Sequence, residues 1–562
     1  MDLSEQRTMK DDTRTVAEAH ARAHISPPPP GVPPVLDEAH VGDIRGALGT
    51  LSQRDSGERR SFRGRLLALL AIIGPGLIVM VGDNDAGGVS TYLQAGQEYG
   101  PTLLWTLILL IPVLIVNQEM VVRLGAVTGV GHGRLIKERF GRFWSFFSIG
   151  DLFILNFLTI VTEFIGVSLV FEYFGISRYI AAPVAACALF AITAGGGFRS
   201  WERTMLVFIA GSLLVIPLFF LAHPQAGAIA THSFAPGIAG GVTSSAVLLI
   251  IAIVGTTVAP WQLFFQQSNV IDKRITTRWI NYERADTVIG AFVVVIGAGA
   301  LMSIAAFGLG GARGIGHFIN AAVTAHALAH NLGSAAGALL AIVLLNASLI
   351  GAAAVTLSTS YAFGDVFGLH HSLHRSFREA RFFYSSFGAL VLAAMGIVLI
   401  PSAPLGVITE AVQALAGVLL PSATVFLLLL CNDREVLGPW VNPPWLNAIA
   451  SLIVTVLVGL SLVLVVATVF PSVNVTTLVG AISALALVGL ALVGLVSYLR
   501  RPRVQIAEEY TAAERRSWTM PPLALLEPVR WSPARRAAMM VLRLYLVIAI
   551  ALMVVKATQI GR

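Results

Sequence analysis

The chain has 562 residues, of which 56% are hydrophobic and only 12% are charged, and its mean hydropathy is +0.78. Soluble domains are about 45–50% apolar and about 25% charged, so this composition excludes an ordinary soluble protein and indicates a chain that crosses a membrane several times. The 38 basic residues outnumber the 31 acidic ones, but in a membrane protein such an excess usually reflects where the loops lie rather than nucleic-acid binding. The two cysteines, Cys187 and Cys431, offer neither a disulfide framework nor a metal-ligand spacing.

The chain begins with a polar segment and continues as a series of apolar runs. Residues 1–65 carry the run SPPPPGVPP and lack the apolar core of a secretory signal, so we expect a disordered cytoplasmic tail. A further run, Ala537–Val555, contains Arg543 and fits equally a thirteenth span and a helix that lies along the membrane surface. Between them, twelve runs of roughly 18–25 residues could each cross about 30 Å of hydrocarbon, and they begin near residues 66, 101, 145, 179, 204, 243, 287, 334, 382, 406, 444 and 474.

Lysine and arginine alternate between the two sides of the predicted spans. The loops after odd-numbered spans hold only Arg178 and Arg313, whereas the loops after even-numbered spans carry basic clusters such as that from Lys273 to Arg278. Five arginines also precede the first span, between residues 54 and 65. Because cytoplasmic loops are enriched in basic residues, we expect a cytoplasmic N-terminus and a multi-pass protein of the cell (inner) membrane.

The first predicted span, which includes GPGLIVMVGDNDAGGVSTYLQAG, places two carboxylates deep in an apolar run. Asp83 and Asp85 lie about a dozen or more residues into the span, where a charge costs at least about 2.5–3.5 kcal/mol and usually faces a cavity. The glycines of the following AGG, residues 86–88, favour unwinding of a helix. Unwound backbone at membrane depth is tolerated where it is buried in protein or lines a water-filled cavity, so we expect an ion site here.

The sixth predicted span contains a second interruption. In IVGTTVAPWQLFFQQS, Ile253–Ser268, the apolar run is broken by Gly255, two threonines and Pro260, which removes a backbone donor. Gly and Pro kinks are common in membrane helices, but a pair at corresponding positions five spans apart is typical of inverted-repeat transporters. The sequence therefore predicts an ion bound at two broken helices near the membrane midplane.

These features predict an all-α fold: a polytopic membrane protein with 12 or 13 transmembrane helices and a LeuT-like core of five-plus-five inverted repeats. Spans one to ten, residues 66–432, would form this transport core. Residues 433–562 would add accessory spans and a cytoplasmic loop at about 500–535.

The two interruptions resemble motifs of the NRAMP family of divalent-metal transporters, which read Asp-Pro-Gly-Asn in the first span and Met-Pro-His-Asn in the sixth. Here the corresponding sequences are DAGG, from Asp85, and APWQ, from Ala259. The stretches RLGAVTG from Arg123, EFIG from Glu163 and LLLLCNDREVLGPWVNPPWLN from Leu427 also match in the right order. The resemblance runs from about residue 66 to about residue 465 and is poor in the eighth and ninth spans.

The resemblance implies a set of ligands for a transported divalent ion, with no resident cofactor. Gln262 and Gln413 could equally serve as interhelical hydrogen-bonding residues, and Glu163 could belong to a structural pair. Asp83 has no acidic counterpart in the family motif and fits either an outer-mouth charge or a solvated helix cap. The implied oxygen ligands are the Asp85 carboxylate, the carbonyls of Gly82 and Thr256, the amides of Gln262 and Gln413, and the Glu163 carboxylate. The residues that would shape the site are Ala86, Gly87, Gly88, Ala259, Pro260 and Trp261.

Three departures from the family motifs bear on the ion. Gly88 replaces the family asparagine, Ala259 the methionine and Trp261 the histidine. A thioether is a soft ligand, whereas Mg²⁺ requires hard oxygen ligands and usually keeps several waters. The substitutions therefore resemble those of the NRAMP-related magnesium transporters, and the sequence predicts a Mg²⁺ transporter for which Mn²⁺ is a further substrate.

The residues that serve proton coupling in the family are also replaced. The resemblance places Ile160 at a third-span aspartate and Trp261 at the sixth-span histidine, and neither side chain carries a proton. We therefore expect transport without proton coupling. Asp151 and His132 are conceivable substitutes, but both lie near predicted span ends and are interpreted as surface residues.

Other functions fit the sequence less well. The main alternative is a proton-coupled Mn²⁺ or Fe²⁺ symporter; a receptor or channel on the same fold, or a transporter of small organic solutes, would need other evidence. His326 with His330, and the HHSLH run from His370 to His374, are interpreted as parts of polar loops rather than metal sites. The sequence contains no Walker motif, catalytic triad or nucleic-acid-binding pattern, so it predicts neither an enzyme nor a nucleic-acid partner, only a metal-ion substrate and the lipid bilayer.

Overall fold

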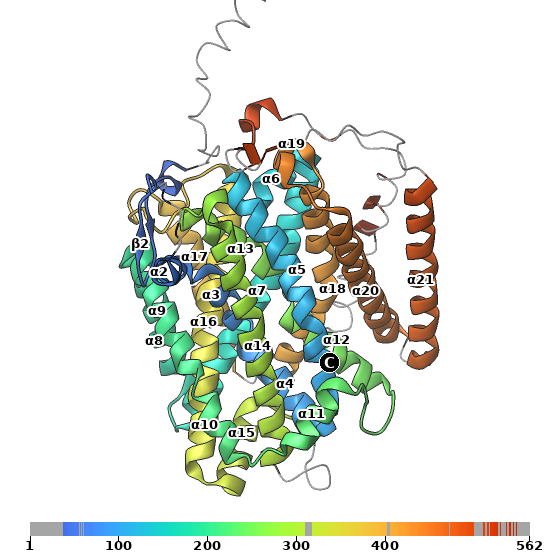
Figure 1. Cartoon of the computed structure of the whole chain (residues 1–562). Coiled ribbons are helices and arrows are strands. Elements are labelled where there is room, and N and C mark those ends of the chain that lie inside the picture. Colours follow the sequence, from blue (N-terminus) through green and yellow to red (C-terminus); the bar gives the residue numbers. More distant parts are fainter. Residues whose placement is uncertain are drawn as a thin grey trace, which may run out of the picture.

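The protein is a bundle of long helices in a computed structural model (Figure 1). The structure describes residues 37–499 except positions 56, 58, 60, 310–316, 402–404 and 471, together with scattered positions between 510 and 547. Within this part of the chain, the β-structure is a single antiparallel pair, β1 (Ile44–Arg45) and β2 (Thr50–Leu51), in which Ile44 pairs with Leu51.

The predicted spans coincide with apolar helices. Among the described residues, nine helices are long and apolar enough to cross a membrane, or ten if a bent pair near the N-terminus is one span. Two shorter apolar helices, Arg178–Ala194 and Val475–Ala491, correspond to the predicted fourth and twelfth spans. Each of the twelve expected start points falls within a helix or one residue before it. The predicted thirteenth run, Ala537–Val555, lies outside the described residues apart from isolated positions.

The order of helices repeats once along the chain. Each half starts with an interrupted helix, α3–α4 in the first and α12–α13 in the second, and contains one very long central helix, α7 or α16, which pack against each other. The first half contains α2 (Phe62–Ile72), α3 (Pro75–Gly82), α4 (Ala86–Tyr99), α5 (Leu104–Thr128), α6 (His132–Phe140), α7 (Arg142–Tyr173), α8 (Arg178–Ala194), α9 (Gly197–Ser212), α10 (Val215–Leu221) and α11 (Ala226–Phe234). The second contains α12 (Ser244–Thr257), α13 (Pro260–Asp272), α14 (Ile280–Gly308), α15 (Ala321–Leu332), α16 (Ser334–Phe367), α17 (Arg381–Val398) and α18 (Leu405–Cys431).

Three further described helices follow α18. They are α19 (Arg434–Leu437), α20 (Pro444–Val469) and α21 (Val475–Leu499). Figure 1 shows α19 at the top of the bundle, and α20 and α21 on one flank with α21 on the outside of α20. Short 3₁₀ turns occur at Glu38–His40 (η1), Gly100–Leu103 (η2), Thr277–Trp279 (η3), Gly438–Trp440 (η4) and Leu523–Leu525 (η5).

The apolar side chains follow the pattern of a membrane protein rather than that of a soluble one. Large apolar residues on the outer helices are exposed, among them Val207 on α9, Ile296 on α14 and Leu485 on α21, each about 70% exposed (68%, 68% and 71%). In contrast, every residue of α13 is buried. Exposed apolar surface of this extent marks contact with lipid or with other proteins, and the polar residues of α13 lie inside the bundle.

A bend separates α2 from α3. The axes of the two helices differ by 52°. The turn between them contains Gly74, whose φ of 153° is a conformation that favours glycine. Pro75 follows at the first position of α3, where proline is common. The backbone amides of Gly74 and Gly76 donate hydrogen bonds of 3.0 and 2.8 Å to Asp286 Oδ2 on α14. This carboxylate therefore fixes the start of α3 against α14.

Residues 37–55, here named the N-terminal strap, are folded onto the end of the bundle that carries the basic loops, at the top of Figure 1. The Arg375 guanidinium donates to Asp37 at 2.6–2.9 Å, and the Ala47 amide donates to Glu202 Oε2 at 2.5 Å. Arg274 donates to two strap carbonyls at 2.9 and 3.1 Å. The structure thus differs from the expected disordered tail over these residues, because these polar contacts hold them together with Ile44 and Leu51, which are buried in the apolar core; residues 1–36 lie outside the described part.

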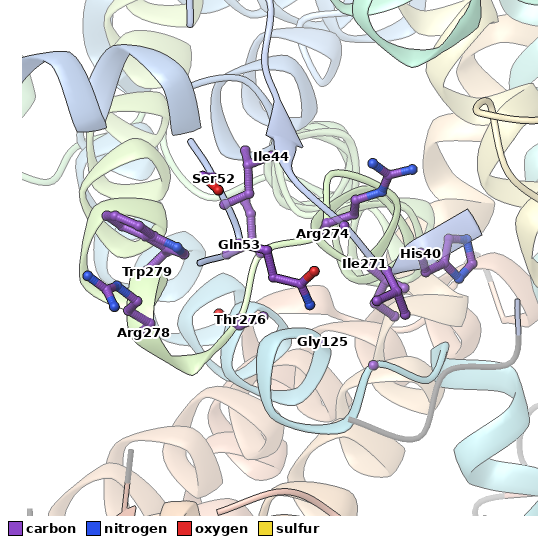
Figure 2. Close-up of a pocket in the computed structure, with 14 residues that line it drawn as sticks. His40, Ile44, Ser52, Gln53, Gly125, Ile271, Arg274, Thr276, Arg278 and Trp279 are labelled. Atoms are coloured by element: carbon purple, nitrogen blue, oxygen red, sulfur yellow. The ribbon is translucent and has the colours of Figure 1, made fainter. Parts of the chain in front are cut away.

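The N-terminal strap also covers a pocket. Figure 2 shows Ile44 and Gln53 of the strap near Ile271, at the end of α13, and near Thr276 and Trp279, which cap and end η3. The pocket has a volume of about 60 Å³. The strap therefore covers the end of the second broken helix rather than an outer face of the bundle.

Candidate metal site at the two helix breaks

The first helix break comprises Asp83, Asn84 and Asp85. α3 ends at Gly82, and Asp85 caps α4 by accepting a hydrogen bond of 2.7 Å from the Gly88 amide to its Oδ1. An aspartate at this position satisfies a free amide and interacts favourably with the helix dipole. The expected unwinding at AGG is therefore wrong in detail, since Ala86, Gly87 and Gly88 form the first turn of α4 and the break precedes them.

The glycines serve close packing instead. A Cβ on Gly87 would collide with the side-chain amide of Gln413 on α18. A Cβ on Gly88 would lie 2.8 Å from the Asp83 carbonyl oxygen and 3.2 Å from Thr256 Oγ1. Small residues at these positions bring α12 and α18 against the start of α4, so the side chains of Thr256 and Gln413 lie beside the helix break.

The second break comprises Val258 and Ala259, between α12 and α13. Pro260 occupies the first position of α13, where its missing amide is not needed. Gln262 is fully buried: its Oε1 accepts a hydrogen bond of 2.9 Å from Gln118 on α5, and its Nε2 lies 3.3 Å from the Thr257 carbonyl oxygen. In this conformation Gln262 links α13 to α5 and to the end of α12 by hydrogen bonds. An interhelical hydrogen-bonding role of this kind was one of the two alternatives that the sequence left open for Gln262.

Trp261 and Gly82 connect the two breaks. The indole of Trp261 is fully buried, and a Cβ on Gly82 would lie 3.4 Å from Trp261 Cη2. The Trp261 carbonyl accepts a hydrogen bond of 3.1 Å from Ser358 on α16. The indole therefore fills space beside the end of α3.

Glu163 brings a second carboxyl group to the first break. It lies on α7, is fully buried, and accepts a hydrogen bond of 3.1 Å from the Ala86 amide at Oε2. The carboxyl groups of Asp85 and Glu163 face each other. Gly351 on α16 leaves room for both, because a Cβ there would lie 2.7 Å from Glu163 Oε2 and 2.8 Å from Asp85 Cβ. The pair joins the first break to both long central helices.

Asp83 is the site residue that sequence reasoning undervalued. Its side chain is 0% exposed, and neither carboxylate oxygen has a hydrogen-bond partner among the described residues. Asp85 and Gln262 are the groups that face it. It is therefore neither an outer-mouth charge nor a solvated cap; its depth in the span was a usable signal, but the family motif offered no acidic counterpart.

Two residues expected at the surface, His132 and Asp151, lie inside the bundle. His132 and Asp151, interpreted as surface residues, are buried, with 0% and 8% exposure. His132 Nδ1 lies 3.1 Å from Gln267 Oε1, and Asp151 lines a cavity of about 10 Å³ beside Pro260. These positions are buried because α6 and the start of α7 pack against α13 and α16 rather than forming a surface loop.

The two histidine clusters differ in structure. His326 and His330 are exposed but lie on helix α15, so the expected polar loop is wrong for them. The run from His370 to His374 lies in the loop between α16 and α17, where His371 Nε2 pairs with Asp365 Oδ1 at 3.0 Å. Across the described part of the chain, no three His, Cys, Asp or Glu side chains converge on a position that could hold a metal ion. Any ion at the helix breaks would therefore need carbonyl, hydroxyl, amide or water oxygens besides the carboxylates.

The fold and the site define a class of protein. Two interrupted helices, each at the start of one of two similar halves, meet inside a bundle of membrane-spanning length, as in multi-pass secondary transporters. The chain belongs to the Nramp family: the family profile, described as natural resistance-associated macrophage protein-like, matches residues 76–467. The resemblance inferred from the sequence is thus confirmed at the level of the family.

Individual relatives agree with this assignment. The chain is 28% identical over 411 residues to the divalent metal cation transporter MntH of Pectobacterium carotovorum, covering 71% of this chain and 95% of that protein. It is 28% identical over 429 residues to MntH of Bacillus subtilis, covering 73% and 95%. A crystal structure of the Eremococcus coleocola manganese transporter superimposes with a TM-score of 0.60 at 19% identity, covering 80% of this chain and 98% of that one, and therefore shares the fold.

Proposed function

We propose that this protein carries divalent metal ions across the membrane into the cytoplasm, with Mg²⁺ as the main substrate and Mn²⁺ as a further one. The observation that carries the proposal is the donor set at the first break: the Asp85 carboxylate faces Glu163, beside the Thr256 hydroxyl and the Gln413 amide. These are hard oxygen donors, which suit Mg²⁺, Ca²⁺ and Mn²⁺. Ala259 supplies no thioether that would favour softer metals.

The ligand roles form part of the same proposal. Asp85 would be the principal anionic ligand, joined by Glu163, by carbonyl oxygens of Gly82 and Thr256, and by the glutamines directly or through water. Thr256 Oγ1 is buried and has no hydrogen-bond partner among the described residues, which leaves it free to bind an ion or its water. The transport core would comprise residues 66–432, with accessory spans at 433–562 and a cytoplasmic N-terminus in the cell (inner) membrane.

Transport without proton coupling is also proposed. Ile160 and Trp261, which stand where the family motifs have ionisable residues, are both fully buried, and neither side chain can accept a proton in the physiological range. Movement of the metal would then follow its electrochemical gradient alone.

A second candidate is a proton-coupled Mn²⁺ or Fe²⁺ symporter. Two observations favour it: the relatives are named as divalent metal cation and manganese transporters, and Asp151 is buried beside Pro260 in a cavity large enough for about one water. Asp151 could thus replace the missing proton carriers.

Flux into sealed liposomes separates these candidates. The lumen would contain a Mg²⁺ or Mn²⁺ indicator together with a pH dye, and the native protein would be compared with Asp85→Asn. Asn84→Ala is the matched control, because Asn84 lies in the same break but donates its amide to the Val294 carbonyl on α14, away from the ligands. We expect Mg²⁺ entry that requires Asp85 and leaves lumenal pH unchanged. Mn²⁺ entry with lumenal acidification and no Mg²⁺ flux would favour the symporter.

A further inference from the structure

Asp83 is a buried carboxylate whose environment is incomplete. It is 0% exposed, and neither oxygen accepts a hydrogen bond within the described part of the chain. The next residue, Asn84, by contrast donates its amide to the Val294 carbonyl at 3.2 Å. Burying an ionised carboxylate without hydrogen bonds or a positive charge is strongly unfavourable, so the position of Asp83 needs a further partner.

No described basic side chain supplies that partner. The groups that act on Asp83, Asp85 and Glu163 are other carboxyl groups, backbone amides, Gln262 and Thr162, without a lysine, arginine or histidine among them. Carboxylates inside a membrane protein that lack a counter-ion mark an ion route. The missing positive charge is therefore of the kind that a transported cation brings.

The backbone places Asp83 next to the proposed ligands. Its carbonyl oxygen lies against Gly88, whose amide holds Asp85, and Thr256 approaches the same glycine. Gln262 and Asp85 face its carboxylate. Asp83 thus lies between the start of α4 and the second broken helix.

We propose that Asp83 is a further anionic residue of the transport site, beside Asp85 and Glu163, and that it binds the water shell of a hydrated divalent cation held by Asp85. The proposal rests on the function proposed above. Contact through water agrees with the observation that no three such side chains converge directly on one metal position among the described residues. Mg²⁺ retains several waters when bound, so the Asp83 carboxylate can bind the ion through them.

The alternative is a structural role, in which a neutral Asp83 carboxylic acid packs beside Gln262. Asparagine would preserve that role, because it has nearly the same shape and can hydrogen-bond to an amide. Asparagine would remove the charge on which a role in ion binding depends. Asp83→Asn therefore separates the two roles.

The test measures Mg²⁺ binding to the purified full-length protein by calorimetry, for the native chain and Asp83→Asn. We expect the Kd of the variant to rise about tenfold or more, as for the loss of an outer-shell partner of a metal, while Asp83→Glu retains tighter binding than Asp83→Asn. Asn84→Ala should leave the Kd unchanged. Cobalt(III) hexaammine, which imitates a hydrated Mg²⁺ ion and does not exchange its ligands, should compete with Mg²⁺ in the native protein and much less in Asp83→Asn.

The outcomes separate this proposal from the proposed function. If Asp83→Asn binds Mg²⁺ within twofold of the native protein while Asp85→Asn does not bind it, Asp83 is structural and the proposed Mg²⁺ site stands. If the native protein binds neither Mg²⁺ nor Mn²⁺, the proposed function fails and the role of Asp83 fails with it. Equal melting temperatures of the native protein and Asp83→Asn would establish that a loss of binding does not arise from unfolding. If the variant melts at a lower temperature, the Kd of Asp83→Glu and the competition by cobalt(III) hexaammine in the native protein test the proposal instead. Absence of that competition overturns the proposal.

Discussion

Acidification should release the N-terminal strap from the bundle, because the strap contains a buried histidine, His40, whose pKa is lowered in the docked state. His40 is buried, and neither ring nitrogen has a hydrogen-bond partner among the described residues. Burial lowers the pKa of His40 to about 4, although the carboxylates of Asp272, Asp37 and Asp365 oppose the change, and the neighbouring His371 adds to it. A strap that has left the bundle would expose His40, whose pKa would return to about 6.5.

The sign and size of the effect follow from these two values. Because the docked state binds its proton only near pH 4, the undocked state holds more protons between pH 6.5 and 4, and docking weakens as the pH falls through that window. The full effect is about 3 kcal/mol, and protonation of His40 alone should increase the opening equilibrium about twentyfold at pH 5 relative to about pH 7. His371 acts in the opposite direction: burial lowers its pKa, but Asp365 outweighs burial and raises it, so its contribution is complete below its ordinary pKa and is lost as the pH rises through the raised value.

Hydrogen exchange measures this opening directly. The amide of Ala47, which donates to Glu202, and those of the β1–β2 pair report on docking, after correction for the intrinsic dependence of exchange on pH. His40→Gln, which stays neutral, is the control and should lose most of the pH dependence between 7 and 5. Equal pH dependence in the native protein and His40→Gln would refute the assignment to His40, and unchanged protection at pH 5 would refute the magnitude.

Three other substitutions probe packing, a buried ion pair and ion choice. Gly87→Ala should reduce flux and lower the melting temperature, because its Cβ would collide with the Gln413 amide; shortening Gln413 to alanine in the same chain should restore the melting temperature, and no effect of the single change would contradict the close approach of α4 and α18. Lys273→Met should cost about 3–5 kcal/mol of stability, because it leaves the Glu202 carboxylate, 2.6 Å away and fully buried, without its cation; denaturant unfolding checks this, with Lys273→Met/Glu202→Leu expected to be more stable than the single variant. Ala259→Met should increase competition by Cd²⁺ against Mg²⁺ in binding assays, since a thioether prefers softer metals, and unchanged competition would mean that residue 259 does not face the ion.

The helices and the helix breaks could be predicted from the sequence, because the length of apolar runs and the pairing of Gly- and Pro-rich interruptions are local signals. The position of the first break was predicted less accurately. The glycines of AGG were expected to unwind, but Asp85 caps α4 and Gly87 and Gly88 serve close approach to Gln413 and Thr256. A sequence shows that a glycine is present, whereas the choice between turning and packing depends on partners from distant segments.

The burial of polar residues was harder to predict from the sequence, for the same reason. Asp151, His132 and the strap lie in polar or span-end stretches, which sequence rules assign to the surface. The structure buries them through pairings over long sequence separations, such as Asp37 with Arg375 and His132 with Gln267. A single sequence contains no signal for such pairings.

The polar residues of α13 connect the helix breaks to the strap. Gln262, Gln266, Asn269 and Lys273 follow one another at helical spacing on one face, and all are buried. Gln262 bonds to α5 through Gln118, Gln266 donates to Thr287 on α14 at 2.9 Å, and Lys273 pairs with Glu202 on α9.

The other face of α13 ends at Asp272, which accepts hydrogen bonds from Tyr361, Ser372 and the Leu373 amide and lies 3.5 Å from His40. Asp272 and Lys273, at one end of α13, thus contact the strap and α9. Gln262 lies near the other end of the same helix and contacts α5, so a single buried helix joins the second helix break to the strap.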